Sequence, residues 1–312
     1  MSIDPFDAPS GAAAPDRDRW GRPLIVPPEG GTAVAYTRCT TYVGALEDRY
    51  NLGLWEQRMV ALGLADRPDL ILSVGAHRDD KRKLDDICAD AKEAAKAHAA
   101  ATTGTAVHKL VERLDLGQPV GTVPDAYRAD LAAYETATAC LEPVAVERFV
   151  VLDDLRIGGT PDRVVRFEGR HFIADLKTGS VEFGAGKIAM QLAVYSRSVH
   201  YDHETRTREP LPGVDQDRAI VIHLPAGSGR CELKWIDIAA GWEAVSLATQ
   251  VRAWRARRSL FTPFQQATSG VLEQITNAAS EDALSALWRQ HMTVWTPELT
   301  AAARARKAAL TP

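Results

Sequence analysis

The chain has 312 residues, of which 46% are hydrophobic and 25% are charged, which is an ordinary globular composition with room for one large domain and an appendage. Its net charge of −4 does not by itself indicate a nucleic-acid-binding protein, although a local basic groove is sufficient for that function. Because no apolar run is long enough to span a membrane and the N-terminus lacks a signal-peptide pattern, we expect a cytoplasmic protein.

In chain order, residues 1–30 are rich in Pro, Gly, Asp and Ala and are predicted to form a flexible N-terminal tail. Several helical patterns follow. They are a helix interrupted at Gly63, an Ala-rich helix from Asp85 that is interrupted at residues 102–104, a helix from about Thr105 to Gly117, and a helix from about Asp125 to Leu141.

The next part of the chain predicts strands. The expected elements are strands over 144–152, 164–167 and 171–174, a helix over 186–200, strands over 219–224 and 231–236, and a long helix capped by Asp237. This order predicts an α/β fold with a central mixed sheet of about five strands flanked by helices.

The last part of the chain is predicted to be a separate helical appendage. Pro263 marks its boundary, and helix-start signals at Ser280 and at Thr296-Pro297 predict a helical hairpin within residues 263–312. Residues 31–262 are then one domain with a helical region at its N-terminal end.

The most informative segment is a predicted hairpin whose turn is Glu168-Gly169. With a two-residue turn, Asp162 and Asp175 fall directly opposite each other, and like charges at such positions destabilise a sheet. Lys177 points to the same face as Asp175 because side chains alternate along a strand. Two facing carboxylates beside an ammonium group are typical of a divalent-cation site, with the Leu176 carbonyl as a further possible ligand. The alternative is a surface hairpin with one salt bridge.

Other residues are candidates for the same site only in combination with this hairpin. His108, on a predicted helix, has the side chain of a metal ligand, but a lone helical histidine is more often packed or exposed. Lys187, Gln191 and Tyr195 are spaced by four residues and share a helix face, which favours contact with a phosphate backbone or an ordinary polar face. Glu147 is a polar residue in an apolar run, and it either adds a carboxylate to the site or faces solvent.

The order of these motifs resembles the PD-(D/E)XK nuclease superfamily. The motifs are Gly104-Thr105-x-x-His108, Gly159-x-x-Asp162, Asp175-x-Lys177-Thr178-Gly179 and Gln191-x-x-x-Tyr195. They look most like those of the RecB-like exonucleases, including phage enzymes, and the resemblance covers about residues 100–200.

The resemblance implies a restriction-endonuclease-like core and a metal-dependent DNA exonuclease of phage recombination or DNA processing. By the resemblance, Mg²⁺ or Mn²⁺ would be held by His108, Asp162, Asp175 and the Leu176 carbonyl, and Lys177 would be the catalytic lysine. Gln191 and Tyr195 would contact DNA and organise the site. The implied partners are DNA and a single-strand annealing or recombination protein.

Two features depart from the closest-looking relatives. The CRISPR-associated exonucleases carry four cysteines for an iron–sulfur cluster, three of them grouped near the C-terminus, whereas the four cysteines here are widely spaced and Cys231 is the last. We therefore predict no cluster. The chain also has no helicase motif. A non-catalytic DNA-binding or recombination-adaptor protein and a structure-specific endonuclease remain alternatives.

Overall fold

The computed structural model describes residues 15–97, 99–258, 260–261 and 268–310. The chain divides into two compact units, residues 1–255 and 256–312. The boundary predicted at Pro263 lies outside the described residues. No helix in the described ranges combines the length and the apolar character that crossing a bilayer requires.

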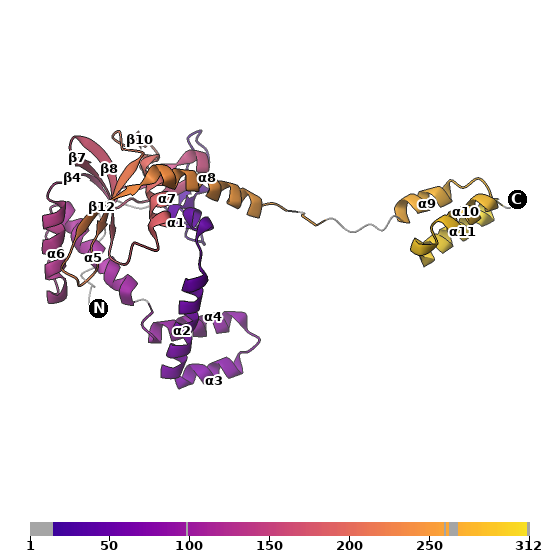
Figure 1. The fold of residues 1–312 in the computed structure, drawn as a ribbon, viewed down its shortest axis with the longest axis horizontal. Helices are drawn as coiled ribbons and strands as arrows, with labels where there is room; N and C mark the ends of the chain where they lie inside the picture. Colours follow the sequence, from indigo (N-terminus) through magenta and orange to yellow (C-terminus); the bar gives the residue numbers. More distant parts are fainter. Residues whose placement is uncertain (1–14, 98, 259, 262–267, 311–312) are drawn as a thin grey trace. The chain divides into compact units, whose positions relative to one another are not determined.

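A mixed five-stranded sheet is the centre of the first unit (Figure 1). Its spatial order is β12-β11-β8-β7-β4, and its strands are β4 (Glu142–Val146), β7 (Arg163–Phe167), β8 (Arg170–Lys177), β11 (Arg218–His223) and β12 (Glu232–Asp237). β8 and β11 are parallel and the other neighbours are antiparallel. The parallel pair requires a crossover, which contains the helix predicted after the hairpin. The predicted α/β architecture with a central mixed sheet is confirmed.

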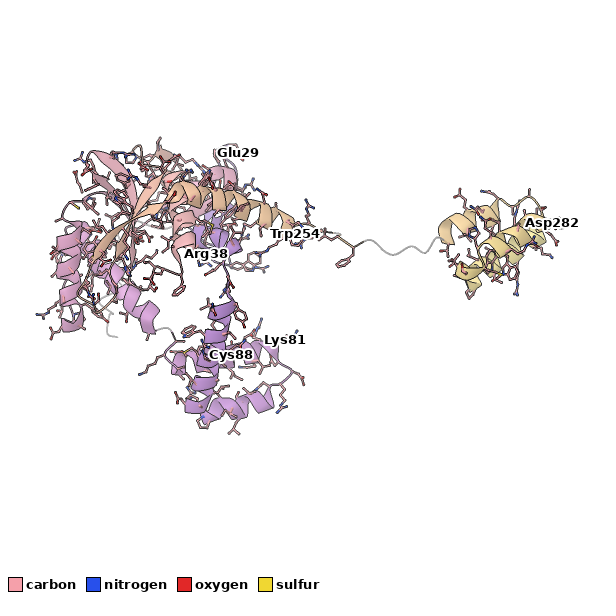
Figure 2. The ribbon with its side chains drawn as sticks, in the orientation of Figure 1. Glu29, Arg38, Lys81, Cys88, Trp254 and Asp282 are labelled. Carbon is pink, nitrogen blue, oxygen red and sulfur yellow. The ribbon has the colours of Figure 1, made fainter. Side chains whose placement is uncertain are left out.

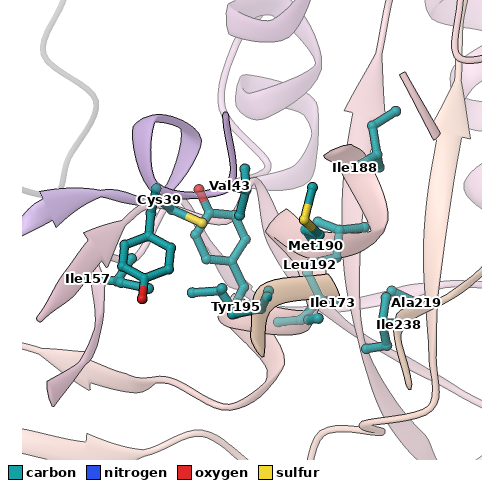
Figure 3. Packing of buried hydrophobic residues seen from close by; sticks show 14 of the residues in the cluster. Cys39, Val43, Ile157, Ile173, Ile188, Met190, Leu192, Tyr195, Ala219 and Ile238 are labelled. Atoms are coloured by element: carbon teal, nitrogen blue, oxygen red, sulfur yellow. The ribbon is translucent and has the colours of Figure 1, made fainter. Parts of the chain in front are cut away.

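Helices cover both faces of this sheet. On one face, Val164, Ile173 and Val221 pack with residues of α1 (Cys39–Val43), α7 (Ala185–Ser196) and α8 (Ile238–Arg255), as Figure 3 shows for part of this cluster. On the other face, Val165, Phe172 and Ile220 pack with α5 (Ala99–Asp115) and α6 (Asp125–Thr138). The alternation of these residues along the strands places every second side chain in a different core. Asp237 caps α8 as predicted, since Asp237 Oδ1 accepts a hydrogen bond from the Ala240 N–H at 2.9 Å.

A second five-stranded sheet was not predicted. Its order is β10-β9-β5-β6-β3, and its strands are β3 (Thr37–Arg38), β5 (Val150–Leu152), β6 (Ile157–Gly159), β9 (Val199–Tyr201) and β10 (Arg208–Pro210). These strands have two or three residues each, which is too short for a periodic sequence pattern.

Short 3₁₀ turns lie at Gly44–Leu46, Asp153–Leu155 and Met292–Val294.

The single strand predicted over residues 144–152 is wrong. It is two strands, β4 and β5, and they belong to different sheets. Glu147, which lies between them, has φ of 49°, a left-handed conformation that interrupts a strand. The polar break noted at Glu147 is therefore the point where the chain passes from one sheet to the other.

The structure describes part of the segment that was predicted to form a flexible tail. Residues 1–14 lie outside the described residues, but β1 (Leu24–Ile25) pairs with β2 (Val34–Ala35). Ile25 is fully buried with Tyr36 and Phe149. The burial of Ile25 ties residues 24–25 to the first unit, in contrast to the flexible tail predicted for residues 1–30.

Three helices between the N-terminal strands and α5 pack on one another (Figure 1). They are α2 (Tyr50–Asp66), α3 (Pro68–Ala76) and α4 (Lys81–Ala94). The helix interruption predicted at Gly63 is wrong, since α2 continues through this residue. A Cβ atom on Gly63 would lie 1.7 Å from the Ala91 carbonyl oxygen of α4, so glycine is needed there for the close approach of two helices.

The second unit contains α9 (Thr268–Thr276), α10 (Glu281–Gln290) and α11 (Pro297–Leu310) around a core of Val271, Ile275, Ala278, Leu284 and Leu299. The helix starts predicted at Ser280 and Pro297 are confirmed, and the Ser280 side chain accepts from the Ala283 N–H at 3.2 Å. The predicted hairpin lacked α9.

We predict that Gly63→Ala destabilises the α2–α4 contact, because the added methyl group overlaps backbone rather than a movable side chain. Overpacking of this kind costs about 1–3 kcal/mol. Gly53→Ala in the same helix is the matched control, because nothing lies within 4 Å of its Cβ position and alanine favours the helix by about 0.5–1 kcal/mol. Thermal unfolding followed by circular dichroism should separate the two variants, and equal stabilities would contradict the packing argument.

Candidate active site

The β7–β8 hairpin brings the two predicted carboxylates together. Its turn residues Glu168 and Gly169 have φ of 49° and 76°, as a type I′ turn requires. The register pairs Phe167 with Arg170 and Arg163 with Ala174, so the next opposed positions are Asp162 and Asp175. The predicted register is confirmed. Asp162 Oδ2 also accepts a hydrogen bond from the Leu176 N–H at 2.7 Å, which fixes its carboxylate beside β8.

Asp175 is a buried carboxyl group beside a cation and another carboxylate. Its side chain is almost inaccessible to solvent, and Oδ2 contacts the Lys177 ammonium group. Burial and the charge of Asp162 raise the pKa of Asp175 to about 7. The alternation predicted for Lys177 agrees with this contact, since both side chains lie on the same side of β8. A buried carboxyl group with a pKa near 7 is an unusual group in a folded protein, and such groups concentrate at functional sites.

His108 of α5 reaches the same place. Its Nδ1 lies 3.6 Å from Asp162 Oδ2, and its ring is one-third exposed. Burial lowers the pKa of His108 despite the neighbouring Asp162, so the imidazole is neutral at pH 7 and offers a lone pair. The interruption predicted at residues 102–104 is wrong, because α5 is continuous through Gly104. A Cβ there would lie 2.6 Å from Thr178 Oγ1, so glycine allows α5 to pass close to the end of β8.

Two further carboxyl groups, those of Glu147 and Glu112, interact electrostatically with Asp162. The Glu147 N–H donates to the Asp162 carbonyl oxygen at 2.9 Å, and burial together with the charges of Asp162 and Glu112 raises the pKa of Glu147 to about 8. Glu147 is thus partly buried and interacts with the charge of Asp162, and its contribution of a carboxyl group to the site stays a prediction. Sequence reasoning missed Glu112, although its spacing of four residues from His108 places both on one face of α5.

Behind the carboxylates lies a buried ion pair that sequence reasoning also missed. Arg163 Nε is 2.9 Å from Asp115 Oδ2, and both side chains are more than 90% buried. The Tyr134 hydroxyl donates to Asp115 Oδ1 at 2.7 Å. The positive charge of Arg163 acts on Glu147 and Asp175, where it opposes the rise in pKa. The sequence signal was an arginine directly before the apolar pair Val164-Val165.

Helix α7 supplies the predicted Gln-x-x-x-Tyr pair, and its two members differ in exposure. Gln191 Nε2 donates to the Tyr195 hydroxyl at 3.2 Å. Tyr195 is only 3% exposed and packs against Gly159, where a Cβ would lie 2.8 Å from the tyrosine ring. Tyr195 is thus part of the core in this structure, and its predicted contact with DNA stays a prediction. Gln191 remains partly accessible, and Lys187 pairs with Glu47 at 3.0 Å.

The donor set fits a hard divalent cation. Asp175 Oδ2 is buried, and no described group donates it a hydrogen bond of regular geometry. It lies instead against one cation, the Lys177 ammonium. Carboxylate and carbonyl oxygens suit Mg²⁺ or Mn²⁺, which usually take one or two protein carboxylates and complete their shell with water and phosphate. Within the described ranges, no three His, Cys, Asp or Glu side chains already converge as a ligand group. The fit therefore rests on two carboxylates, not on a closed protein cage.

Comparison with known proteins identifies the family. A model described as the PD-(D/E)XK nuclease superfamily matches residues 123–293, which is more than half of the chain. The matched range contains Asp162, Asp175 and Lys177, while His108 precedes it. A search of the curated proteins found no match.

We predict that, with chelator present, the free energy of unfolding falls as pH rises from about 6.5 to 8. Asp175 and Glu147 have folded pKa values of about 7 and about 8, above their ordinary values, so the folded state holds more protons than the unfolded state in this range. His108, whose pKa is lowered by burial, acts in the opposite direction, and its contribution fades as the pH rises above the ordinary histidine pKa of about 6.5. Urea unfolding at several pH values measures this slope.

Asp175→Asn should flatten the slope, and the exposed Asp154→Asn should leave it unchanged. A wild-type stability that is constant or rises between pH 6.5 and 8 would contradict the assignment of raised carboxyl pKa values.

Proposed function

This chain belongs to the PD-(D/E)XK nuclease superfamily, and from that premise we propose that it is a metal-dependent DNA exonuclease. The observation that carries the proposal is the opposed pair of Asp162 and Asp175 with the Lys177 ammonium against it. Burying two like charges costs several kcal/mol unless a cation compensates them. This arrangement would destabilise a hairpin whose role was only structural.

Each site residue has a distinct task in this proposal. Asp162, Asp175, the Leu176 carbonyl and the neutral His108 would hold Mg²⁺ or Mn²⁺, which when bound polarises a phosphoryl oxygen and lowers the pKa of water. Lys177 would place its ammonium group beside the phosphate, where it orients the attacking water and neutralises the charge that develops on the phosphoryl oxygens. Glu147, close to Asp162, would add a carboxyl group that accepts or holds a proton.

DNA contact is assigned to the exposed side of α7. Gln191 is half-buried and fixed by Tyr195, so its amide is pre-oriented toward a phosphate or sugar. Lys187, four residues earlier, is on the same face and would exchange its exposed partner Glu47 for a phosphate group. Exposed ion pairs are worth at most about 1 kcal/mol, so this exchange is inexpensive.

The exonuclease assignment and a role in phage recombination or DNA processing are supported by the order of the motifs, which is similar to that of RecB-like exonucleases. An endonuclease would use the same site. A non-catalytic DNA-binding adaptor is disfavoured because Asp162, Asp175 and Lys177 are all present and in contact or opposed.

We predict that Asp175→Asn and Lys177→Ala each lower the nuclease rate at least about 100-fold, which is the usual loss when one group that stabilises the transition state is removed. Lys234→Ala, an exposed lysine of β12, is the matched control and should retain activity. Degradation of labelled linear DNA in Mg²⁺ or Mn²⁺ measures the rates, with circular dichroism to show that each variant is folded. Normal rates in the Asp175 and Lys177 variants would refute the site.

The exonuclease assignment is tested with end-labelled linear DNA and covalently closed circular DNA, each in Mg²⁺, in Mn²⁺ and with chelator. We expect the linear DNA to be degraded in either metal, the circle to remain intact, and chelator to stop the reaction. Cleavage of the circle would indicate an endonuclease. Binding of DNA without cleavage in both metals would indicate the adaptor.

A further inference from the structure

The second unit contains a pocket of about 470 Å³ between one face of α10 and one face of α11. Its lining comprises Glu281, Leu284, Ser285, Trp288, Arg289, Trp295, Thr300, Ala303, Arg304 and Lys307. All of these residues belong to the second unit, and none has a task in the candidate active site. A pocket of this volume accommodates one or two large side chains of a partner.

The walls of the pocket are held in place by the unit itself. Leu284 belongs to the core that α9, α10 and α11 share. The Trp295 indole N–H donates to Thr300 Oγ1 at 3.0 Å, and Arg289 Nε donates to the Ser285 carbonyl oxygen at 3.3 Å. These bonds fix the orientation of the Trp295 ring and of the Arg289 guanidinium group. The side chains of the pocket would therefore lose little conformational entropy when a ligand binds.

The residue types in this pocket are those of a protein-binding site. Trp288 is 48% exposed and lies outside the core of the unit. Tryptophan and arginine are enriched among residues that dominate protein–protein binding energies, and the pocket contains two of each. Three cationic side chains line it with a single carboxylate, Glu281, whose partner is Lys307 at 2.7 Å.

Charge distinguishes a peptide ligand from a nucleic acid. Between residues 268 and 310 the chain has four acidic and four basic residues, so this part of the unit carries no net charge. A nucleic-acid-binding module needs a basic surface that follows several phosphates. Three cations gathered around one apolar pocket, in a part of the unit whose remaining residues are net acidic, instead complement a short ligand with its own negative charge.

We propose that this pocket binds an acidic peptide segment of a partner protein, with one large apolar or aromatic side chain of the segment inserted between Trp288 and Trp295. Arg289 and Arg304 bind the carboxylates that flank this side chain. The second unit is then a recruitment module, and this activity goes beyond the nuclease reaction and does not require it.

The test is selection of peptides from a displayed random library on the full-length protein, followed by fluorescence anisotropy with the synthetic selected peptides. We expect the selected peptides to combine Asp or Glu with an aromatic or large aliphatic residue. Trp288→Ala should weaken their binding at least about tenfold, in line with the loss of a central tryptophan. Arg304→Ala should weaken it several-fold and reduce its dependence on salt.

The controls are Trp254→Ala and Arg255→Ala, which alter an exposed tryptophan (labelled in Figure 2) and an exposed arginine at the end of α8. Both should leave peptide binding unchanged. Degradation of linear DNA, measured on the same variants, should be unchanged by Trp288→Ala, so a failure of the nuclease proposal is seen separately. Three results would overturn the inference: no enrichment, enriched peptides without acidic residues, or equal binding by the Trp288 variant. Loss of single-stranded oligonucleotide binding in the Trp288 and Arg304 variants, without loss of peptide binding, would overturn it in favour of a nucleic-acid ligand.

Discussion

Two carboxylates held opposite each other at the end of a hairpin are the constraint on which the arrangement around them depends. Asp162 and Asp175 cannot both be ionised and buried without a compensating charge. The surrounding groups provide that compensation in part. Lys177 contacts Asp175, and the buried Arg163 acts on the same group from the adjacent strand position. The pKa of Asp175 nevertheless stays near 7, so its ionised form is only partly stabilised. A divalent cation bound here would stabilise the ionised carboxylate further.

The fold enforces this unfavourable pairing through contacts that lie outside the carboxylates. The type I′ turn at Glu168-Gly169 fixes one register for β7 and β8, because a two-residue loop pairs Phe167 directly with Arg170. Two close approaches add to it. Gly104 lets α5 pass Thr178, and Gly159 lets Tyr195 of α7 pack under the second sheet. Packing in the two hydrophobic cores therefore stabilises the fold enough to keep the two carboxylates close together.

The two units differ in the chemistry they present. The first buries charged groups whose proton affinities are shifted, which is the character of a catalytic site. The second has a small apolar core and a pocket lined by tryptophan and arginine, which is the character of a binding site. Hydrolysis and the choice of a partner would then be functions of separate parts of one chain.

The sequence by itself determined the hairpin, its register, and the central five-stranded sheet. These depend on the turn chemistry of Glu168-Gly169 and on side-chain alternation, both of which are local. The motif order also indicated the superfamily. Only the tertiary structure decided where Glu147, Glu112 and Tyr195 lie and how deeply they are buried. Burial and long-range proximity raise the pKa of Glu147 and place Tyr195 in the core, and no local pattern encodes either. The second sheet could not be predicted from the sequence either. Its strands have two or three residues, and strands this short form because of the segments they pair with in space, not because of a pattern in their own sequence.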